Sequence, residues 1–273
     1  MRANLPWRVA LPTVPDSVSP SDSVPSRGPS PGPVSESADP LAELASLEGV
    51  GSSMAAARDG IDALLRDRGL RRTAPELTGE SLLRGAHASA MLEGSTSSLD
   101  DVREGRADEH AAAAVRVSTE LLGLVPVLAH SPLQALARVH TLAAKGEVDD
   151  ADLGRPVDAV AAERLAGLSR LLLGKSAAPA LVLAAVVHAE LRTVAPFASH
   201  NGIVARAAER LVLVARGVDP TSLTVPEAGH LELRTAYESN LIGYAEGGVA
   251  GVHSWLLYAA EAFTKGADAS PLR

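Results

Sequence analysis

Cysteine is absent from the 273-residue chain, and aromatic residues make up only 3% of it. Without cysteine the chain cannot form disulfides, bind iron–sulfur clusters, use a thiol nucleophile or hold a cysteine-ligated zinc ion. The scarcity of aromatic rings leaves little material for a surface that stacks nucleic-acid bases. Hydrophobic residues, at 46%, are nevertheless numerous enough to build a large core.

Acidic residues outnumber basic ones, 33 against 25, which gives a formal net charge of −8, and only three of the basic residues are lysines. Nucleic-acid binding normally needs a basic face that displaces counterions from the phosphate backbone. We therefore expect no direct nucleic-acid partner.

No apolar run in the sequence is long enough to cross a membrane. The longest run near the middle of the chain, residues 177–187, is interrupted by Pro179 and falls short of the ~20 residues that a span requires. Pro6, Pro12 and Pro15 interrupt the region in which a signal peptide would carry its apolar core. The sequence therefore predicts a cytoplasmic protein with no membrane partner.

The composition divides the chain into three parts. Residues 1–40 contain nine of the 18 prolines, interleaved with serines, and such a segment buries too little apolar surface to offset its chain entropy. We expect a disordered tail over 1–40, one folded domain over 41–266 and a short C-terminal tail over 267–273. The N-terminal segment is interpreted as a tether, and a short docking patch at 5–11 is the alternative.

Most of residues 41–266 has helical spacing, which predicts an all-α domain. Thr78 is expected to cap a helix over about 78–93, and a short β-hairpin is the one departure allowed, at 146–156. Residues 181–191 are apolar on every side, which is typical of a buried central helix. The other expected helices cover about 54–69, 107–125, 132–145, 158–173, 203–216, 228–245 and 249–265.

Three short patterns suggest chemistry but lack the context that the chemistry needs. Residues 174–176 read GKS, but a P-loop needs a glycine where Ser169 stands and a preceding strand. Residues 188–190 read HAE, the first half of a zinc-deaminase motif whose second half requires cysteine. The remaining histidines show no HExxH spacing, and single helical histidines are more often structural than metal ligands. We therefore expect no metal site.

The segment HAELRTVAPFASHNGIVAR, residues 188–206, joins two expected helices through a loop. Backbone N–H groups of such a loop and the positive end of the following helix converge on one point, which makes an anion site suited to a nucleotide phosphate. Arg206 lies one turn into the second helix and can reach the same point. A tight interhelical turn, in which Gly202 supplies backbone freedom, is the alternative.

This loop resembles the signature of the Fic/Doc (Fido) family, HPFx(D/E)GNGRxxR, because residues 195–206 read APFASHNGIVAR without a gap. A second family motif, (S/T)xxxE(G/N) of the N-terminal inhibitory helix, matches SAMLEG at 89–94. The resemblance covers about 50–265. It implies the Fido helical bundle, ATP and Mg²⁺ as ligands, and AMP transfer to a Ser, Thr or Tyr hydroxyl of a target protein.

Several positions depart from the signature, and each replaces a residue that catalyses AMP transfer or binds the nucleotide in the family. Ala195 replaces the general-base histidine, Ser199 replaces the acidic Mg²⁺ ligand, Ile203 replaces the first arginine and His200 replaces the first glycine. Removal of a general base alone typically lowers a rate by roughly 10²–10⁴. The resemblance therefore implies a catalytically impaired member, in which four matching residues are left to bind nucleotide: Phe197, Asn201, Gly202 and Arg206.

Both partners of the family's inhibitory ion pair are present, as Glu93 and Arg206. In the family this glutamate binds the second signature arginine and occludes the position of the ATP γ-phosphate. The resemblance thus implies inhibitory roles for Ser89, Glu93 and Gly94. Because the pair is retained while the catalytic positions diverge, we interpret it as a clamp between two helices.

Three functions stay open on the sequence alone. The first is a nucleotide-responsive pseudoenzyme, the second a weak or rewired nucleotidyl- or phosphotransferase that uses His200 as base, and the third a non-enzymatic interaction scaffold. We favour the first and expect His200 to fill the anion loop. The resemblance also implies an unidentified protein partner and a homodimer, whereas the missing carboxylate at Ser199 argues against Mg²⁺.

Overall fold

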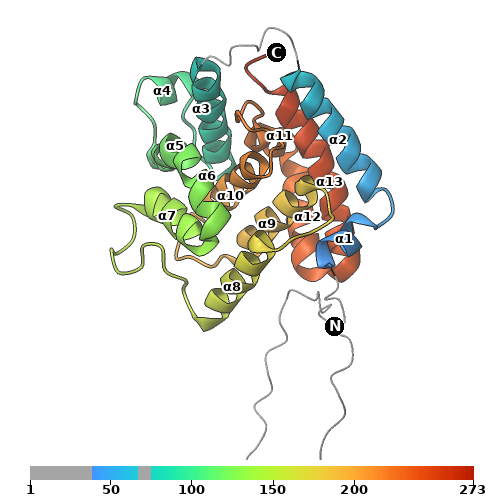
Figure 1. Ribbon diagram of the computed structural model, residues 1–273. Coiled ribbons are helices and arrows are strands. Elements are labelled where there is room, and N and C mark those ends of the chain that lie inside the picture. The colour runs from blue at the N-terminus through green and yellow to red at the C-terminus, as the bar shows by residue number, and fades with distance from the viewer. Residues whose placement is uncertain (1–38, 67–74) are drawn as a thin grey trace, which may run out of the picture.

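The computed structural model describes residues 39–66 and 75–273, which fold as an assembly of helices (Figure 1). No strand occurs among these residues, so the predicted all-α class is confirmed. The tail expected over 1–40 lies almost wholly outside the described residues, as does the expected end of the first helix near 69.

The described helices differ in length, and the longest of them, α13, comes last. In the described residues they are α1 (Pro40–Ala45), α2 (Val50–Leu65), α3 (Pro75–Leu92), α4 (Leu99–Arg103), α5 (Glu109–Glu120), the 3₁₀ helix η2 (Leu121–Leu124), α6 (Val125–His130), α7 (Pro132–Ala144), α8 (Ala159–Leu173), α9 (Ala180–Val194), α10 (Asn201–Ala215), α11 (Pro226–Glu232), α12 (Arg234–Glu246) and α13 (Gly248–Asp268).

Helices α9 and α10 pack against each other through the middle of the molecule (Figure 1). Helices α3, α5, α6 and α7 lie on one side of this pair, and α2, α12 and α13 lie on the other. Every residue from Leu181 to Leu191 is buried, as expected for the central helix. Helix α10 is buried just as fully, from Gly202 to Leu213, although three charged residues interrupt its apolar pattern.

Helix α3 contains the expected inhibitory helix but starts earlier. It begins at Pro75, a residue well suited to a first helical turn, so the prediction that Thr78 caps it is wrong. The Thr78 hydroxyl instead donates to the carbonyl of Thr221, 2.9 Å away. The helix ends at Leu92, and Gly94 follows with a φ of 98°, a conformation that favours glycine.

The β-hairpin expected at 146–156 is wrong. The described chain has only an isolated bridge there, between Lys145 and Val148. Gly146 and Gly154 both adopt positive φ, so the segment turns repeatedly instead of running as two extended strands. It reaches the loop after α9 by one main-chain hydrogen bond, from the N–H of Val157 to the carbonyl of Pro196 (2.9 Å).

The expectation that no segment is long and apolar enough to cross a membrane is corrected by the stretch Glu109–His130, formed by α5, η2 and α6. This stretch meets the requirement by length and composition, with a mean hydropathy of 1.5 in its most apolar window. Core helices of soluble proteins have the same property, and this stretch packs on α3, α7 and α10. Its buried residues are Ala111, Ala113, Ala114, Val117, Leu121, Leu124 and Leu128. The absence of a membrane partner stays a prediction.

The C-terminal part differs from expectation at two points. The helix expected over 228–245 is two helices, α11 and α12, which meet at Leu233. Helix α11 packs very closely on α13, since a β-carbon on Gly229 would lie 2.0 Å from the carbonyl oxygen of Ala262. Helix α13 continues to Asp268 and Ser270 is buried, so the packed chain extends a few residues beyond 266.

Candidate functional site

The loop of residues 195–200, here called the signature loop, joins α9 to α10. Ala195 and His200 stand at its two ends with φ of 47° and 55°, in the left-handed region that residues with a β-carbon rarely adopt. Asn201 closes the loop, because its Oδ1 accepts from the Phe197 N–H (2.9 Å) and its Nδ2 donates to the Phe197 carbonyl (2.8 Å). The Asn201 amide therefore holds the backbone turn.

Phe197 anchors the signature loop in the core and does not contact the adjacent cavity described below. It is buried and stacks on His140, with ring centroids 4.5 Å apart and planes 8° from parallel. The Gly154 N–H donates to His140 Nδ1 (2.9 Å), which ties the segment after α7 to the same stack. Burial, and then the nearby His200, lower the pKa of His140 from 6.5 to about 4. Phe197 therefore packs the loop onto the core, and the nucleotide contact expected for it stays a prediction.

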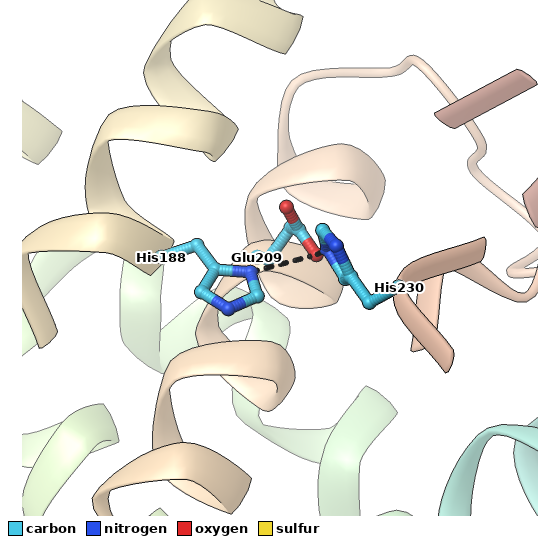
Figure 2. Close-up of side chains that lie close together, drawn as sticks. All are labelled: His188, Glu209 and His230. Carbon is cyan, nitrogen blue, oxygen red and sulfur yellow. Dashed lines mark hydrogen bonds and ion pairs between the residues drawn. The ribbon is translucent and has the colours of Figure 1, made fainter. Parts of the chain in front are cut away.

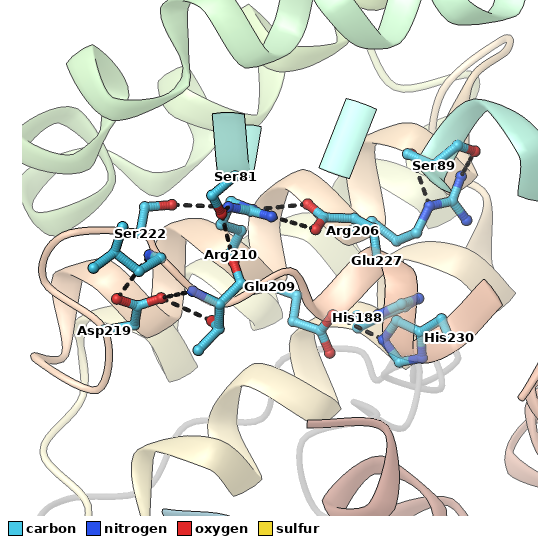
Figure 3. A network of polar contacts seen from close by, with 12 residues as sticks. Ser81, Ser89, His188, Arg206, Glu209, Arg210, Asp219, Ser222, Glu227 and His230 are labelled. Atoms are coloured by element: carbon cyan, nitrogen blue, oxygen red, sulfur yellow. Dashed lines mark hydrogen bonds and ion pairs between the residues drawn. The ribbon is translucent and has the colours of Figure 1, made fainter. Parts of the chain in front are cut away.

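Arg206 brings α3 and α10 together and is itself only 1% exposed. Its Nη2 lies 2.5 Å from Oε1 of Glu93, and this ion pair is called the latch below. Its Nε donates to the Ser89 hydroxyl (2.8 Å) and its Nη2 to the Ser89 carbonyl (3.1 Å), contacts that Figure 3 shows. Its Nη1 donates to the Tyr237 hydroxyl (3.3 Å). Glu93 and Arg206, which the sequence resemblance pairs, therefore meet, and Ser89 of the same motif joins them.

The latch is an ionised pair. Burial alone would raise the pKa of the Glu93 carboxyl, but the charge of Arg206 and its hydrogen bond outweigh burial and hold the pKa below its ordinary value. Arg206 keeps its charge for the same reason, because its partners offset the cost of burial. Both groups are therefore charged at neutral pH.

The Glu93 carboxylate lies directly over the first turn of α10. A β-carbon built on Gly202 would lie 2.0 Å from Glu93 Oε1, so only glycine permits this approach. The N-terminus of a helix attracts anions through its free N–H groups and its dipole. The place where an anionic ligand would bind is consequently filled by a carboxylate of the protein itself.

His200 is packed against its neighbours instead of facing an open site. Its side chain is 7% exposed, with Nδ1 2.8 Å from the Ser199 hydroxyl and Nε2 3.1 Å from Oε2 of Glu147. Arg116 approaches the other oxygen of Glu147 at 3.6 Å. His200 therefore links the signature loop to the segment after α7, and it fills the space that a glycine would leave.

A cavity of about 340 Å³ lies next to the latch. Glu93 and Arg206 line it, together with Arg192 at the end of α9 and Tyr237 and Ile242 of α12. Its volume falls in the lower part of the ~300–1,000 Å³ range of small-molecule sites. Two further carboxylates, Glu238 and Glu246, also line it. The cavity thus combines charges of both signs with an aromatic side chain and an exposed apolar residue.

A second arginine of α10, Arg210, contacts the N-terminal half of α3 (Figure 3). Arg210 lies one turn after Arg206 and makes two hydrogen bonds to Glu227, of 2.9 and 2.6 Å. Its Nη1 also donates to the hydroxyls of Ser81 (3.2 Å) and Ser222 (3.0 Å). Because Ser81 is on α3 and Glu227 on α11, three helices are joined at this point.

Sequence reasoning missed a buried cluster formed by His188, Glu209 and His230 (Figure 2). The three residues come from α9, α10 and α11, and one donor atom of each lies within 4.8 Å of the others. The expectation of no metal site considered only spacing along the chain and stays a prediction, beside which the structure places one candidate cluster. The available signal was the presence of ionisable residues at fully buried helical positions.

Similarity to known proteins is found at the level of structure and not of sequence. Neither protein-family models nor curated proteins match the sequence. A Fic family protein from Desulfovibrio desulfuricans G20 matches the structure with a TM-score of 0.66 at 18% identity, over 80% of this chain and 74% of that one. Fic-1 from C. elegans (aa134–508) matches with a TM-score of 0.62 at 17% identity, over 80% and 72%. A variant of the same nematode protein gives 0.59 at 19%, over 84% and 73%.

The fold is that of Fic family proteins. The two places where the sequence resembled that family, residues 89–94 and 195–206, therefore lie on a matching scaffold, and they meet in space through the latch.

The residues around the signature loop of this Fic fold do not fit a Mg²⁺ site. Mg²⁺ requires a near-octahedral set of oxygen donors, usually including a free carboxylate. Ser199 offers only a hydroxyl, which lies against His200. Carboxylates do contact the loop, but Glu93 is paired with Arg206, and Glu147 lies against His200 and Arg116.

Proposed function

We propose that the protein is a nucleotide-binding module with a Fic fold, impaired in AMP transfer, in which the latch controls access to the nucleotide site. The observation that carries the proposal is the position of the Glu93 carboxylate. It lies over the N-terminus of α10 and against Arg206, where a phosphate group would find the same two partners.

The cavity beside the latch supports a nucleotide as the ligand class. Release of Glu93 would expose the first turn of α10 and free Arg206 to bind phosphate, while Arg192 adds a second positive charge to a lining that also carries Glu238 and Glu246. Tyr237 and Ile242 line the same cavity, and the exposed Ile242 can supply apolar contact to a nucleoside. We name ATP as the first ligand to test because the sequence resemblance implies it.

The signature loop supports impaired catalysis. Ala195 is exposed but carries no group that can accept a proton, and Ile203 is buried and cannot bind phosphate. His200 would need to leave both Ser199 and Glu147 before it could act as a base. A general base and a metal-bound phosphate each contribute strongly to phosphoryl transfer, so the loss of both leaves little activity.

The proposal is tested by calorimetric titration of ATP, with and without Mg²⁺, into the wild-type chain and Glu93→Gly. We expect ATP to bind the variant at least about tenfold more tightly than the wild type, because its phosphate no longer competes with the Glu93 carboxylate. Tenfold corresponds to ~1.4 kcal/mol of binding free energy. Mg²⁺ should change the affinity little. Glu147→Gln is the matched control, since it removes a carboxylate that touches the loop but not Arg206, and it should bind as the wild type does.

Two results would contradict this function. If ATP binds to neither the wild type nor Glu93→Gly, while circular dichroism shows that both are folded, the protein is an interaction scaffold. If labelled ATP modifies the chain or an added protein and His200→Ala abolishes the labelling, the protein is a rewired transferase.

A further inference from the structure

The buried cluster of His188, Glu209 and His230 has the composition of a transition-metal site. Nδ1 of His188 lies 3.1 Å and Nε2 of His230 2.9 Å from the same oxygen of Glu209 (Figure 2). All three side chains are completely buried. Two imidazoles and one carboxylate from three different helices thus converge on one point.

The far nitrogen of each imidazole is fixed by a tyrosine hydroxyl. His188 Nε2 lies 2.9 Å from the hydroxyl of Tyr237, and His230 Nδ1 lies 2.8 Å from that of Tyr258. Metal-bound histidines almost always have such an outer partner, which sets the ring orientation and the tautomer. The arrangement aims the remaining nitrogen of each ring at the Glu209 carboxylate.

The cluster is also incompletely satisfied. Although His188 Nδ1 is close to Glu209, it makes no hydrogen bond of normal geometry, and Oε1 of Glu209 has no hydrogen-bond partner in the described part of the chain. A buried carboxylate oxygen without a partner is costly, and such groups in folded proteins usually have one. A cation placed between the three side chains would satisfy both atoms.

We propose that His188, Glu209 and His230 bind one divalent transition-metal ion of the zinc class. Imidazole nitrogens with a carboxylate favour Zn²⁺, Co²⁺ and Ni²⁺, whereas Mg²⁺ and Ca²⁺ prefer oxygen alone. Both oxygens of Glu209 can coordinate, so three residues supply four donor atoms, the usual number for zinc. Trp255 lies against both rings, and complete burial leaves no position for a substrate. The site is therefore structural.

The metal would join α9, α10 and α11 beneath the latch. Tyr237, which orients His188, also accepts a hydrogen bond from Arg206 at 3.3 Å. The proposed site thus holds the residue that positions the latch arginine. It does not depend on nucleotide binding, so it can be tested in the absence of any nucleotide.

The test uses the full chain, unfolded in denaturant with a chelator, and refolded with or without Zn²⁺ or Co²⁺. After gel filtration we expect one metal ion per chain by elemental analysis, visible d–d absorption for the Co²⁺ form, and a Tm rise of about 5 °C or more. Glu209→Gln keeps the shape of the carboxylate and should lose the Co²⁺ absorption. His140→Gln, which alters a buried histidine outside the cluster, should retain it.

Three results would overturn the proposal. They are a wild-type chain that refolds without bound metal, a Tm that is unchanged by Zn²⁺, and a Co²⁺ spectrum that is the same in Glu209→Gln. If Glu209→Gln fails to fold, His230→Gln is measured instead. The wild-type metal content decides the question in either case.

Discussion

Neutralising Glu93 and Arg206 singly and together measures how strongly the latch holds α3 to α10. The variants are Glu93→Gln, Arg206→Met and the double variant, and the readout is the free energy of unfolding in urea at pH 7. The double-mutant cycle cancels the bonds of Arg206 to Ser89 and Tyr237, because those bonds are lost equally with and without Glu93.

The expected coupling energy follows from burial. Exposed ion pairs contribute about 0.2–1 kcal/mol, and removal of one partner of a fully buried pair costs about 3–5 kcal/mol. In the latch the Arg206 side chain is 1% exposed and that of Glu93 is 23% exposed. An intermediate value of about 2 kcal/mol is therefore expected. Added salt should change it little, since the pair is shielded from mobile ions.

A matched control is available on α12, where Arg234 and Glu238 form an ion pair one turn apart with side chains 48% and 59% exposed. The same cycle on that pair should give only about 0.3–0.5 kcal/mol. A latch coupling no larger than this control would refute the argument that the pair is a buried clamp.

Two further predictions concern α3 and the histidine that packs under the signature loop. A β-carbon on Gly85 would lie 2.6 Å from Nη2 of Arg210, so Gly85→Ala should lower the unfolding free energy by about 1–3 kcal/mol. Gly79→Ala, on the same helix but with open space around it, should raise it by about 0.5–1 kcal/mol. Equal effects of the two changes would show that α3 is not held as described. The pKa of His140 is lowered from 6.5 to about 4, so the unfolded chain alone binds this proton as the pH falls from 6.5 to 4. Stability should drop by up to about 3 kcal/mol over that interval, and urea unfolding of His140→Gln should show a smaller drop. An identical pH dependence in the variant would contradict the assignment.

Local patterns explain why much of the fold was predictable from the sequence. The all-round apolar run at 181–191 identified the central helix, and the matches at 89–94 and 195–206 identified both halves of the latch. The same local patterns predicted the wrong structure at two places, where nearby residues determined the backbone conformation. Pro75 started α3 before Thr78 could cap it, and the turns at 146–156 replaced the expected hairpin.

Long-range contacts account for what the sequence could not reveal. His188, Glu209 and His230 are separated by about twenty residues each, so no spacing rule places them together. Helix α10 is buried although it carries Arg206, Glu209 and Arg210, because residues far away in the sequence pair with each of them. The cytoplasmic location, the protein partner and the homodimer stay predictions.

A crystal structure of Glu93→Gly with a non-hydrolysable ATP analogue would show whether the latch occupies a phosphate site. We expect a phosphate group over the first turn of α10, within hydrogen-bond distance of the Gly202 N–H and Arg206, and a nucleoside in the cavity beside Tyr237. A crystal soaked with the analogue in which that position stays free of phosphate, or in which the nucleotide lies elsewhere, would contradict this expectation.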